Sequence, residues 1–206
     1  MNIIKIKMLI MRLFITAIVL IFSLQSLAKA DDITDFEIEG ISVRDSALNF
    51  ITEEFIKSST TDNGFYKDKK YFEITFDSKE TNYENISLTF KNNDNKYIIY
   101  QLAGTIAYDD VNECLVQKKN IVNELSKIFL NAEKVDAGER NYASDPTGES
   151  KTYIEYFWIE SGGFIEVGCY DLTKKLADEK NWLKTSLNVG IVTQEFSDFL
   201  INVHYK

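Results

Sequence analysis

Histidine is almost absent from this chain, and its scarcity argues against several classes of enzyme. The 206 residues contain a single histidine, His204, close to the C-terminus. A Ser-His-Asp or Cys-His site needs an imidazole held within hydrogen-bond reach of a nucleophile, and a position just beyond the last predicted helix is a poor place for one. We therefore interpret His204 as an exposed tail residue. The sequence also lacks H-E-x-x-H, C-x-x-C and multi-histidine motifs, so we expect no metal site and no cofactor.

Apolar stretches long enough to span a membrane are also missing. The apolar run Leu13–Leu24 is about half of the roughly 20 residues that a bilayer-spanning helix needs. Basic residues and no acids surround this run, and the small-x-small triplet "AKA" follows it, ending at Ala30. The pattern predicts a secretory signal peptide over residues 1–30, cleaved after Ala30, with a non-cleaved anchor as the alternative. Met11 opens a well-proportioned signal by itself, so both Met1 and Met11 stay open as the start.

Basic residues are in the minority, which argues against two kinds of partner. The chain has 23 Lys and Arg against 32 Asp and Glu, a net charge of −9. Removal of residues 1–30 takes away four basic residues and no acid, so the remaining 176 residues carry about −13. A charge of this sign opposes binding to nucleic acid or to anionic membranes. Pro146 is the only proline and no low-complexity linker occurs, so residues 31–206 are predicted to form a single domain.

Alternating polar and apolar residues predict antiparallel strands. The stretches at 71–77, 85–90 and 97–108 form a first group, and those at 152–160, 164–172 and 186–192 a second. In the first group Thr75, Ser87, Thr89 and Gln101 lie on the polar side of the alternation. Period two with a polar side is typical of a sheet with one face in water.

Three helices are predicted around these strands. The first begins at Ser42, whose hydroxyl is placed to cap the helix, and continues to Phe55. The second runs from Asp110, the expected cap, to Ala132, and the third spans residues 194–203. The fold class is therefore α+β, with about six strands, helices packed on one face and the order α-β-β-β-α-β-β-β-α. Two smaller sheets, one per half, are the alternative.

Several segments together resemble a group of uncharacterised secreted proteins of marine alphaproteobacteria. The residues that carry the resemblance are "DDITDFEIEGISVRDSALNF", "KYIIYQLAG", "NECLVQKKNIVNELSKIF", "DPTGES", "EVGCYDLT" and "EFSDFL". The resemblance spans nearly all of the chain after residue 30 and implies a bacterial envelope setting, but it implies no catalytic residues. A weaker likeness, over residues 39–50 alone, is to the small envelope binding modules of outer-membrane assembly lipoproteins and β-lactamase-inhibitor-like repeats.

The two cysteines are predicted to form a disulfide. An exported chain enters an oxidising compartment, which favours Cys114–Cys169 pairing. Cys114 lies on the apolar stripe of the long helix, and Cys169 shares a strand face with Ile165 and Val167, so both sulfurs point into the helix–sheet interface. Two buried free thiols are the alternative, and in neither case is a nucleophilic cysteine expected.

Acidic residues offer the remaining candidates for chemistry. Glu155, Glu166 and Asp171 lie on or beside neighbouring predicted strands, and two carboxylates about 5 to 9 Å apart can hydrolyse glycosides. Solvated surface is the stronger interpretation for these residues in so acidic a chain. The cluster Asp109, Asp110 and Glu113 could attract calcium, although helix capping explains most of it.

The function expected from these observations is non-catalytic binding. We expect an exported envelope protein, periplasmic or secreted, that binds a protein or small ligand. Its expected recognition surface is the polar sheet face, and Trp182, in a predicted loop, is the expected interface residue because aromatic side chains anchor interfaces. The alternative is a periplasmic hydrolase that uses paired carboxylates.

The cleavage site is directly testable. We expect the exported protein to begin at Asp31, because the "AKA" triplet directly precedes it. Intact-mass measurement of the protein from the producing cell checks this. An N-terminus upstream of Ser26, or an intact signal in the membrane fraction, would contradict it.

Overall fold

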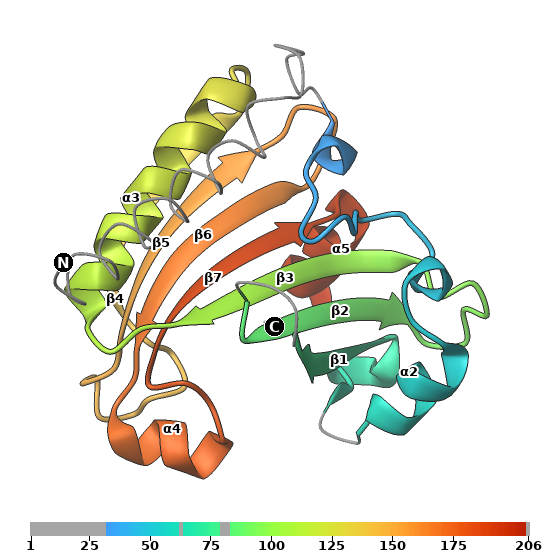
Figure 1. The fold of residues 1–206 in the computed structure, drawn as a ribbon, viewed down its shortest axis with the longest axis horizontal. Helices are drawn as coiled ribbons and strands as arrows, with labels where there is room; N and C mark the ends of the chain where they lie inside the picture. Colours follow the sequence, from blue (N-terminus) through green and yellow to red (C-terminus); the bar gives the residue numbers. More distant parts are fainter. Residues whose placement is uncertain (1–31, 62–63, 79–82, 205–206) are drawn as a thin grey trace, which may run out of the picture.

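A single antiparallel sheet of seven strands organises the chain. The structure, a computed structural model, describes residues 32–61, 64–78 and 83–204, so the predicted signal peptide and its cleavage site lie outside it. The strand order is β1-β2-β3-β7-β6-β5-β4, and every neighbouring pair is antiparallel (Figure 1). The α+β class is confirmed, and the sheet is continuous rather than divided between the two halves.

The strands are β1 (Tyr71–Asp77), β2 (Asn85–Lys91), β3 (Ile99–Ala107), β4 (Glu133–Asn141), β5 (Lys151–Trp158), β6 (Phe164–Asp171) and β7 (Thr185–Val192). The α-helices are α2 (Glu53–Ser59), α3 (Val111–Ile128), α4 (Lys174–Lys180) and α5 (Gln194–Phe199). Short 3₁₀ turns lie at Ile33–Asp35, Ala47–Asn49 and Lys67–Lys69, and a π-helical turn at Leu200–His204 follows α5.

The expectation of six strands was wrong because β4 has no apolar alternation. Its sequence, "EKVDAGERN", is exposed along almost its whole length, and it pairs with β5 at one edge of the sheet. Charged side chains and the bulge between Asp136 and Gly138 are typical of an edge strand that must not recruit another chain. The short helix α4 between β6 and β7 was also not predicted, so the observed order of elements differs from the expected one.

The first helix begins later than its sequence predicts. Ser42 caps nothing: its hydroxyl donates to the backbone oxygens of Thr34 and Phe36, both at 3.0 Å. The first α-helix of the described residues starts at Glu53, capped by the Thr52 side chain. Residues 32–50 instead pack against the sheet in an irregular path, because Ile33, Ile38 and Val43 are drawn into the core.

The two faces of the sheet carry different side chains and different helices. The apolar face presents Ile74, Leu88, Leu102, Val189, Val167 and Phe157, which join the main core with residues of α3 and of the 33–47 segment. The opposite face, called the polar face below, is covered at one end by Phe196 and Phe199 of α5, which pack with Tyr71, Phe164 and Val192. The expectation that the helices pack on one face only was therefore wrong, because α3 and α5 lie on opposite faces of the sheet (Figure 1).

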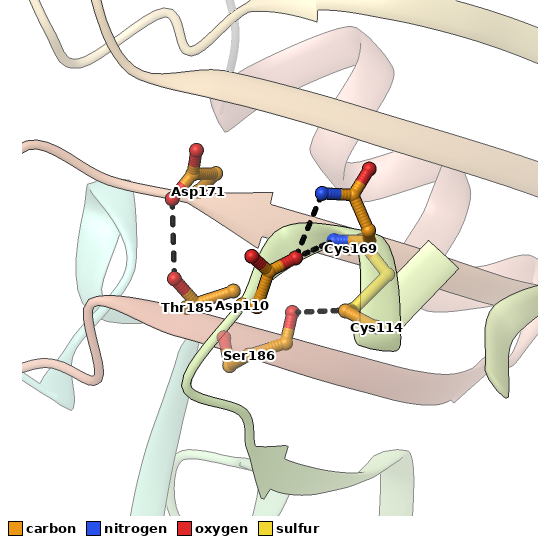
Figure 2. Close-up of a disulfide and its surroundings, with 7 residues drawn as sticks. Asp110, Cys114, Cys169, Asp171, Thr185 and Ser186 are labelled. Atoms are coloured by element: carbon orange, nitrogen blue, oxygen red, sulfur yellow. Dashed lines mark hydrogen bonds between the residues drawn. A yellow bond between two sulfur atoms is a disulfide. The ribbon is translucent and has the colours of Figure 1, made fainter. Parts of the chain in front are cut away.

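A disulfide fixes α3 to the middle of the sheet. Cys114 and Cys169 are fully buried and joined, with their Cα atoms 6.0 Å apart, as their predicted positions on the helix stripe and the strand face require. Figure 2 shows the bond spanning from the first turn of α3 to β6, with Asp110 beside it. The Asp110 carboxylate accepts from the backbone N–H of Asn112 at 2.6 Å, so the helix is capped where it is covalently held.

Removing this bond should weaken the fold without changing its topology. Replacing Cys114 and Cys169 together by serine is expected to lower the free energy of unfolding by about 4 kcal/mol, because the bond closes a loop of 55 residues in the unfolded chain. Denaturant unfolding of both proteins, followed by circular dichroism, measures the difference. Equal stability of wild type and variant in the absence of reductant would contradict the expectation.

Candidate functional site

The polar face of the sheet gathers residues of six strands, most of them with hydrogen-bonding side chains. The residues that define it are Glu73, Thr75, Ser87, Thr89, Gln101, Thr105, Asn188, Gly190, Glu166, Gly168, Tyr170, Tyr156 and Trp158. Thr75 and Ser87 share a hydrogen bond of 2.7 Å between their hydroxyls, and the Asn188 amide donates to the Thr105 hydroxyl at 3.2 Å. The sequence-predicted polar residues Thr75, Ser87, Thr89 and Gln101 thus do lie on one face.

Glu166 lies near the centre of this face, and one tyrosine reaches it. The Tyr170 hydroxyl donates to Glu166 Oε1 at 2.8 Å. Both residues belong to β6, and the ring of Tyr170 leans back across Gly168, which lies between them on the same face. A Cβ at Gly168 would lie 3.3 Å from the Tyr170 ring and 3.1 Å from Ile154, so the missing side chain gives the ring its path. Burial raises the pKa of Glu166 above its ordinary value, and the Tyr170 hydrogen bond offsets part of this rise.

Aromatic side chains continue from Tyr170 to the surface. The Tyr142 ring packs edge-on against Tyr170 and against Trp182, with centroid distances of 6.1 and 6.3 Å. Trp182 lies directly beyond α4, whose last turn is closed by Asn181 in the left-handed conformation and by the Trp182 N–H bonded to the Ala177 oxygen. Trp182 is 48% exposed, so this aromatic series leads from Glu166 to a ring in contact with solvent.

A buried aspartate holds the loop that supplies Tyr142. The Asp145 carboxylate accepts hydrogen bonds from the backbone N–H groups and the hydroxyls of Thr147 and Ser150. These bonds hold the pKa of Asp145 well below its ordinary value, led by the Ser150 hydroxyl. The Ser150 hydroxyl in turn accepts from the N–H of Thr173, the cap of α4, so loop and helix are fixed together.

A second partly buried glutamate, Glu73, lies at the other end of the face. Glu73 accepts from the Tyr66 hydroxyl at 3.0 Å and from the Thr89 hydroxyl at 3.4 Å, and burial raises its pKa. Tyr66 belongs to the aromatic cluster formed by α5 and the C-terminal turn, and His204 joins that cluster by packing on Tyr66 and Phe199. The interpretation of His204 as an exposed tail residue was therefore wrong, because its ring is partly buried between aromatic rings.

The three carboxylates proposed for hydrolysis are not brought together. Glu155 lies on the apolar face, where Lys118 and Lys134 pair with it at 3.4 and 3.2 Å, whereas Glu166 lies on the polar face with the sheet between them. Asp171 shares the face of Glu155 and accepts from the Thr185 hydroxyl at 3.1 Å. The β5–β6 register pairs Asp171 with a residue four positions before Glu155, which separates their backbones by roughly 13 Å.

Metal ligation and grooves do not single out another site. Within the described ranges no three His, Cys, Asp or Glu residues lie close enough to hold a metal ion, and Asp110 serves as the cap of α3. A groove of about 480 Å³ lies beside α5, and the charged groups that line it have partners: Glu195 pairs with Lys91, Arg44 pairs with Asp32, and Asp198 accepts from the Gln194 amide at 2.7 Å. No helix in the described part of the chain is long and apolar enough to cross a membrane.

Comparison with known proteins adds no family to this description. Neither the protein-family models, nor the curated proteins, nor the solved structures give a match to this chain. The argument for function therefore rests on the residues themselves. Of these residues, the sequence analysis named Glu166 and Trp182, but it did not find that Glu166 is hydrogen-bonded to Tyr170 or that Gly168 permits the bond. The sequence does contain a signal for this bond: Gly168 lies two residues after Glu166 and two before Tyr170, so all three lie on the same face of one strand.

Glu166 and Glu155, which lie on opposite faces of the sheet, should respond oppositely to neutralisation. Glu166→Gln is expected to raise the free energy of unfolding at neutral pH by about 0.5–2 kcal/mol, since it removes a charge that burial disfavours. Glu155→Gln, the matched control, is expected to lower it by about 1–3 kcal/mol, because two lysines lose their partner. Thermal and denaturant unfolding of the three proteins measures both changes.

The sign of the pH dependence follows from the raised pKa of Glu166. Below the ordinary value of 4.5 the carboxyl is protonated in both the folded and the unfolded chain, so it has no effect on stability. As pH rises through the interval between that value and the raised pKa, the unfolded state ionises first and wild type loses stability. Glu166→Gln should therefore show a smaller fall above pH 4.5, and an unchanged pH profile would contradict the assignment.

Proposed function

We propose that this protein is an exported, non-catalytic binding protein whose recognition surface is the polar face of the sheet. The observation that carries the proposal is the connected series from Glu166 through Tyr170 and Tyr142 to the half-exposed Trp182. It joins an interior carboxylate, hydrogen-bonding groups and a solvent-facing aromatic ring on one side of a rigid sheet. Binding sites commonly combine such groups.

The position of the other candidate residues supports binding over hydrolysis. Glu155 is held by two lysines on the opposite face, and Asp171 is bonded to a neighbouring threonine. Glycoside hydrolysis needs two carboxylates converging on one bond, and Glu166 has no such companion within the described part of its face near Tyr170. We therefore keep the hydrolase as the second hypothesis, with no observation that favours it.

The proposed location is the bacterial envelope, periplasmic or secreted. The predicted signal peptide is the basis for this, and the buried disulfide is compatible with it because such bonds persist in oxidising compartments. The excess of acidic residues supports the expectation that neither nucleic acid nor anionic membrane is a partner.

Trp182 provides the direct test of the proposed surface. Immobilised mature protein is exposed to envelope extract of the producing organism, and the retained proteins and small molecules are quantified by mass spectrometry. Trp182→Ala is expected to reduce the specifically retained material at least about tenfold, as removal of an aromatic anchor typically does. Val116→Ala is the matched control, since Val116 is also exposed and apolar but lies on α3, on the other side of the sheet.

Two results would contradict the proposal. One is equal loss of retention in Trp182→Ala and Val116→Ala, which would mean that retention reflects general surface stickiness. The other is hydrolysis of a glycoside by the purified protein that Glu166→Gln abolishes while the variant stays folded. The second result would favour the hydrolase, because loss of one general acid or base costs about 10²–10⁴-fold in rate.

A further inference from the structure

The strand β1 forms one edge of the sheet, and its alternate residues direct their backbone groups away from β2. Directly after β1, the Ser78 N–H donates to the Glu84 oxygen on the β2 side. Directly before it, the Lys70 oxygen accepts from the Asn92 N–H, so the even-numbered residues of β1 bond to β2. Neighbouring residues of a strand direct their backbone groups to opposite sides. The odd-numbered residues therefore face outward, each with one N–H and one C=O.

Only the first half of this edge is covered. An isolated antiparallel bridge between Phe65 and Phe72 lies beside the start of the strand. Further along, Thr75 and Asp77 are both exposed, and no other described residue forms a hydrogen bond with their outward backbone groups. Thr75 and Asp77 are called the open edge of β1 below.

The opposite edge of the sheet is protected against strand addition, whereas the open edge of β1 is not. β4 carries Lys134 and Arg140 and is interrupted by a bulge. β1 pairs with β2 in unbroken register from Tyr71 to Asp77, and it contains no basic residue. Lysines and bulges are among the features by which edge strands avoid pairing with another chain. Their absence from β1 leaves its open edge able to accept one.

The side chains of the open edge indicate what kind of strand would fit. On the apolar face, Phe76 is partly buried and packs edge-on against Phe55, with a centroid distance of 5.6 Å, and Phe55 is 38% exposed. On the polar face, Asp77 is exposed and forms no ion pair with any residue that the structure describes. Directly opposite residues of paired strands interact on the same face, and opposite charges favour pairing. The fitting strand therefore has an apolar residue beside Phe76 and a basic residue opposite Asp77.

We infer that the open edge of β1 accepts an extended peptide segment as an additional antiparallel strand, with Lys or Arg opposite Asp77. Antiparallel addition continues the pairing found throughout the sheet. Charge complementarity identifies the partner, since a chain of net charge −9 attracts a basic segment. A second copy of this chain fits less well, because it would bring another Asp77 to the same short ladder without a cation.

A synthetic peptide of alternating lysine and valine, Ac-Lys-Val-Lys-Val-Lys-Val-Lys-NH2, tests the inference. Its binding to the mature protein is expected to be saturable in fluorescence anisotropy. Methylation of the lysine backbone nitrogens is expected to weaken binding at least about tenfold, because antiparallel pairing directs those N–H groups toward β1. Methylation of the valine nitrogens, which face away from β1, is the matched control. Equal binding of the two methylated peptides, or no binding of the parent peptide, would overturn the inference.

Two variants at Thr75 separate the backbone from the side chain. Thr75→Pro removes the outward N–H but no bond to β2, so the edge strand tolerates it, and peptide binding should weaken about tenfold. Thr75→Val loses the same hydroxyl bond to Ser87 but keeps the N–H, so it should bind the peptide as wild type does. Circular dichroism checks the folding of both, and equal peptide affinity of the two folded variants would contradict the inference. If Thr75→Pro unfolds, the methylated peptides decide the question on the wild-type protein.

The charge at Asp77 is tested separately. Asp77→Asn is expected to weaken peptide binding about two- to fivefold, the range typical of a cross-strand pair of opposite charges. Glu160→Gln is the matched control, since Glu160 is exposed beyond the end of β5 and its replacement changes the net charge equally. Equal weakening in the two variants would overturn the inference in favour of general attraction to an acidic surface.

The outcome also separates this inference from the proposed function, because the open edge is a different surface from the series that ends at Trp182. Trp182→Ala is expected to leave peptide binding unchanged. Loss of peptide binding in Trp182→Ala but not in Thr75→Pro would place the peptide on the other surface and overturn the inference alone. A dimer in analytical ultracentrifugation that Thr75→Pro abolishes would overturn it in favour of a second copy. Retention that depends on Trp182 remains the separate test of the proposed function.

Discussion

The alternation of side chains along an antiparallel sheet is the constraint on which the rest of this structure depends. Consecutive residues of a strand must point to opposite faces, and seven strands in register extend that division across the whole molecule. Isoleucine, leucine, valine and phenylalanine occupy one set of positions and form the core with α3. Polar residues occupy the other set, so one face meets a helix and the other remains a polar surface between α4 and α5. A shift of one residue in any strand would exchange the two.

Two glutamates illustrate how the same residue type acquires opposite properties from this division. Glu155 and Glu166 lie on adjacent strands, one position apart in the register. Glu155 faces the core side, where α3 and β4 provide Lys118 and Lys134, and the ion pairs compensate its burial. Glu166 faces the polar side and has a tyrosine hydroxyl instead. The first arrangement stabilises the fold. The second leaves a carboxylate without a cation, which the fold alone does not require, and this supports the polar face as a candidate site.

The disulfide and Asp145 hold the polar face in place. The disulfide acts from the opposite face of the sheet, and Asp145 acts through the loop that carries Tyr142. Cys114–Cys169 joins α3 to β6, the strand that carries Glu166, Gly168 and Tyr170 on its other face. Asp145 binds Ser150, and Ser150 binds Thr173, the cap of α4, so the loop that carries Tyr142 is fixed to the start of α4. The aromatic series toward Trp182 is therefore held by covalent and hydrogen-bonded connections rather than by its own ring contacts alone. A preorganised surface of this kind loses less conformational entropy when it binds.

The sequence by itself determined the α+β class, six of the seven strands, the long helix and the pairing of its two cysteines. Each of these follows from periodicity, which is a local property, and the cysteines from the two periodicities combined with an expected oxidising compartment. The edge strand β4 and the short helix α4 were not predicted because neither has a full apolar stripe. The prediction of a helix beginning at Ser42 was wrong because core packing of residues 32–50 outweighed a local capping signal. Only the tertiary structure decided which acids share a face, which have cations, and that Gly168 lets Tyr170 reach Glu166. Those relations depend on strand order, register and the space above each residue, and none of them is encoded in the spacing of residues along the chain.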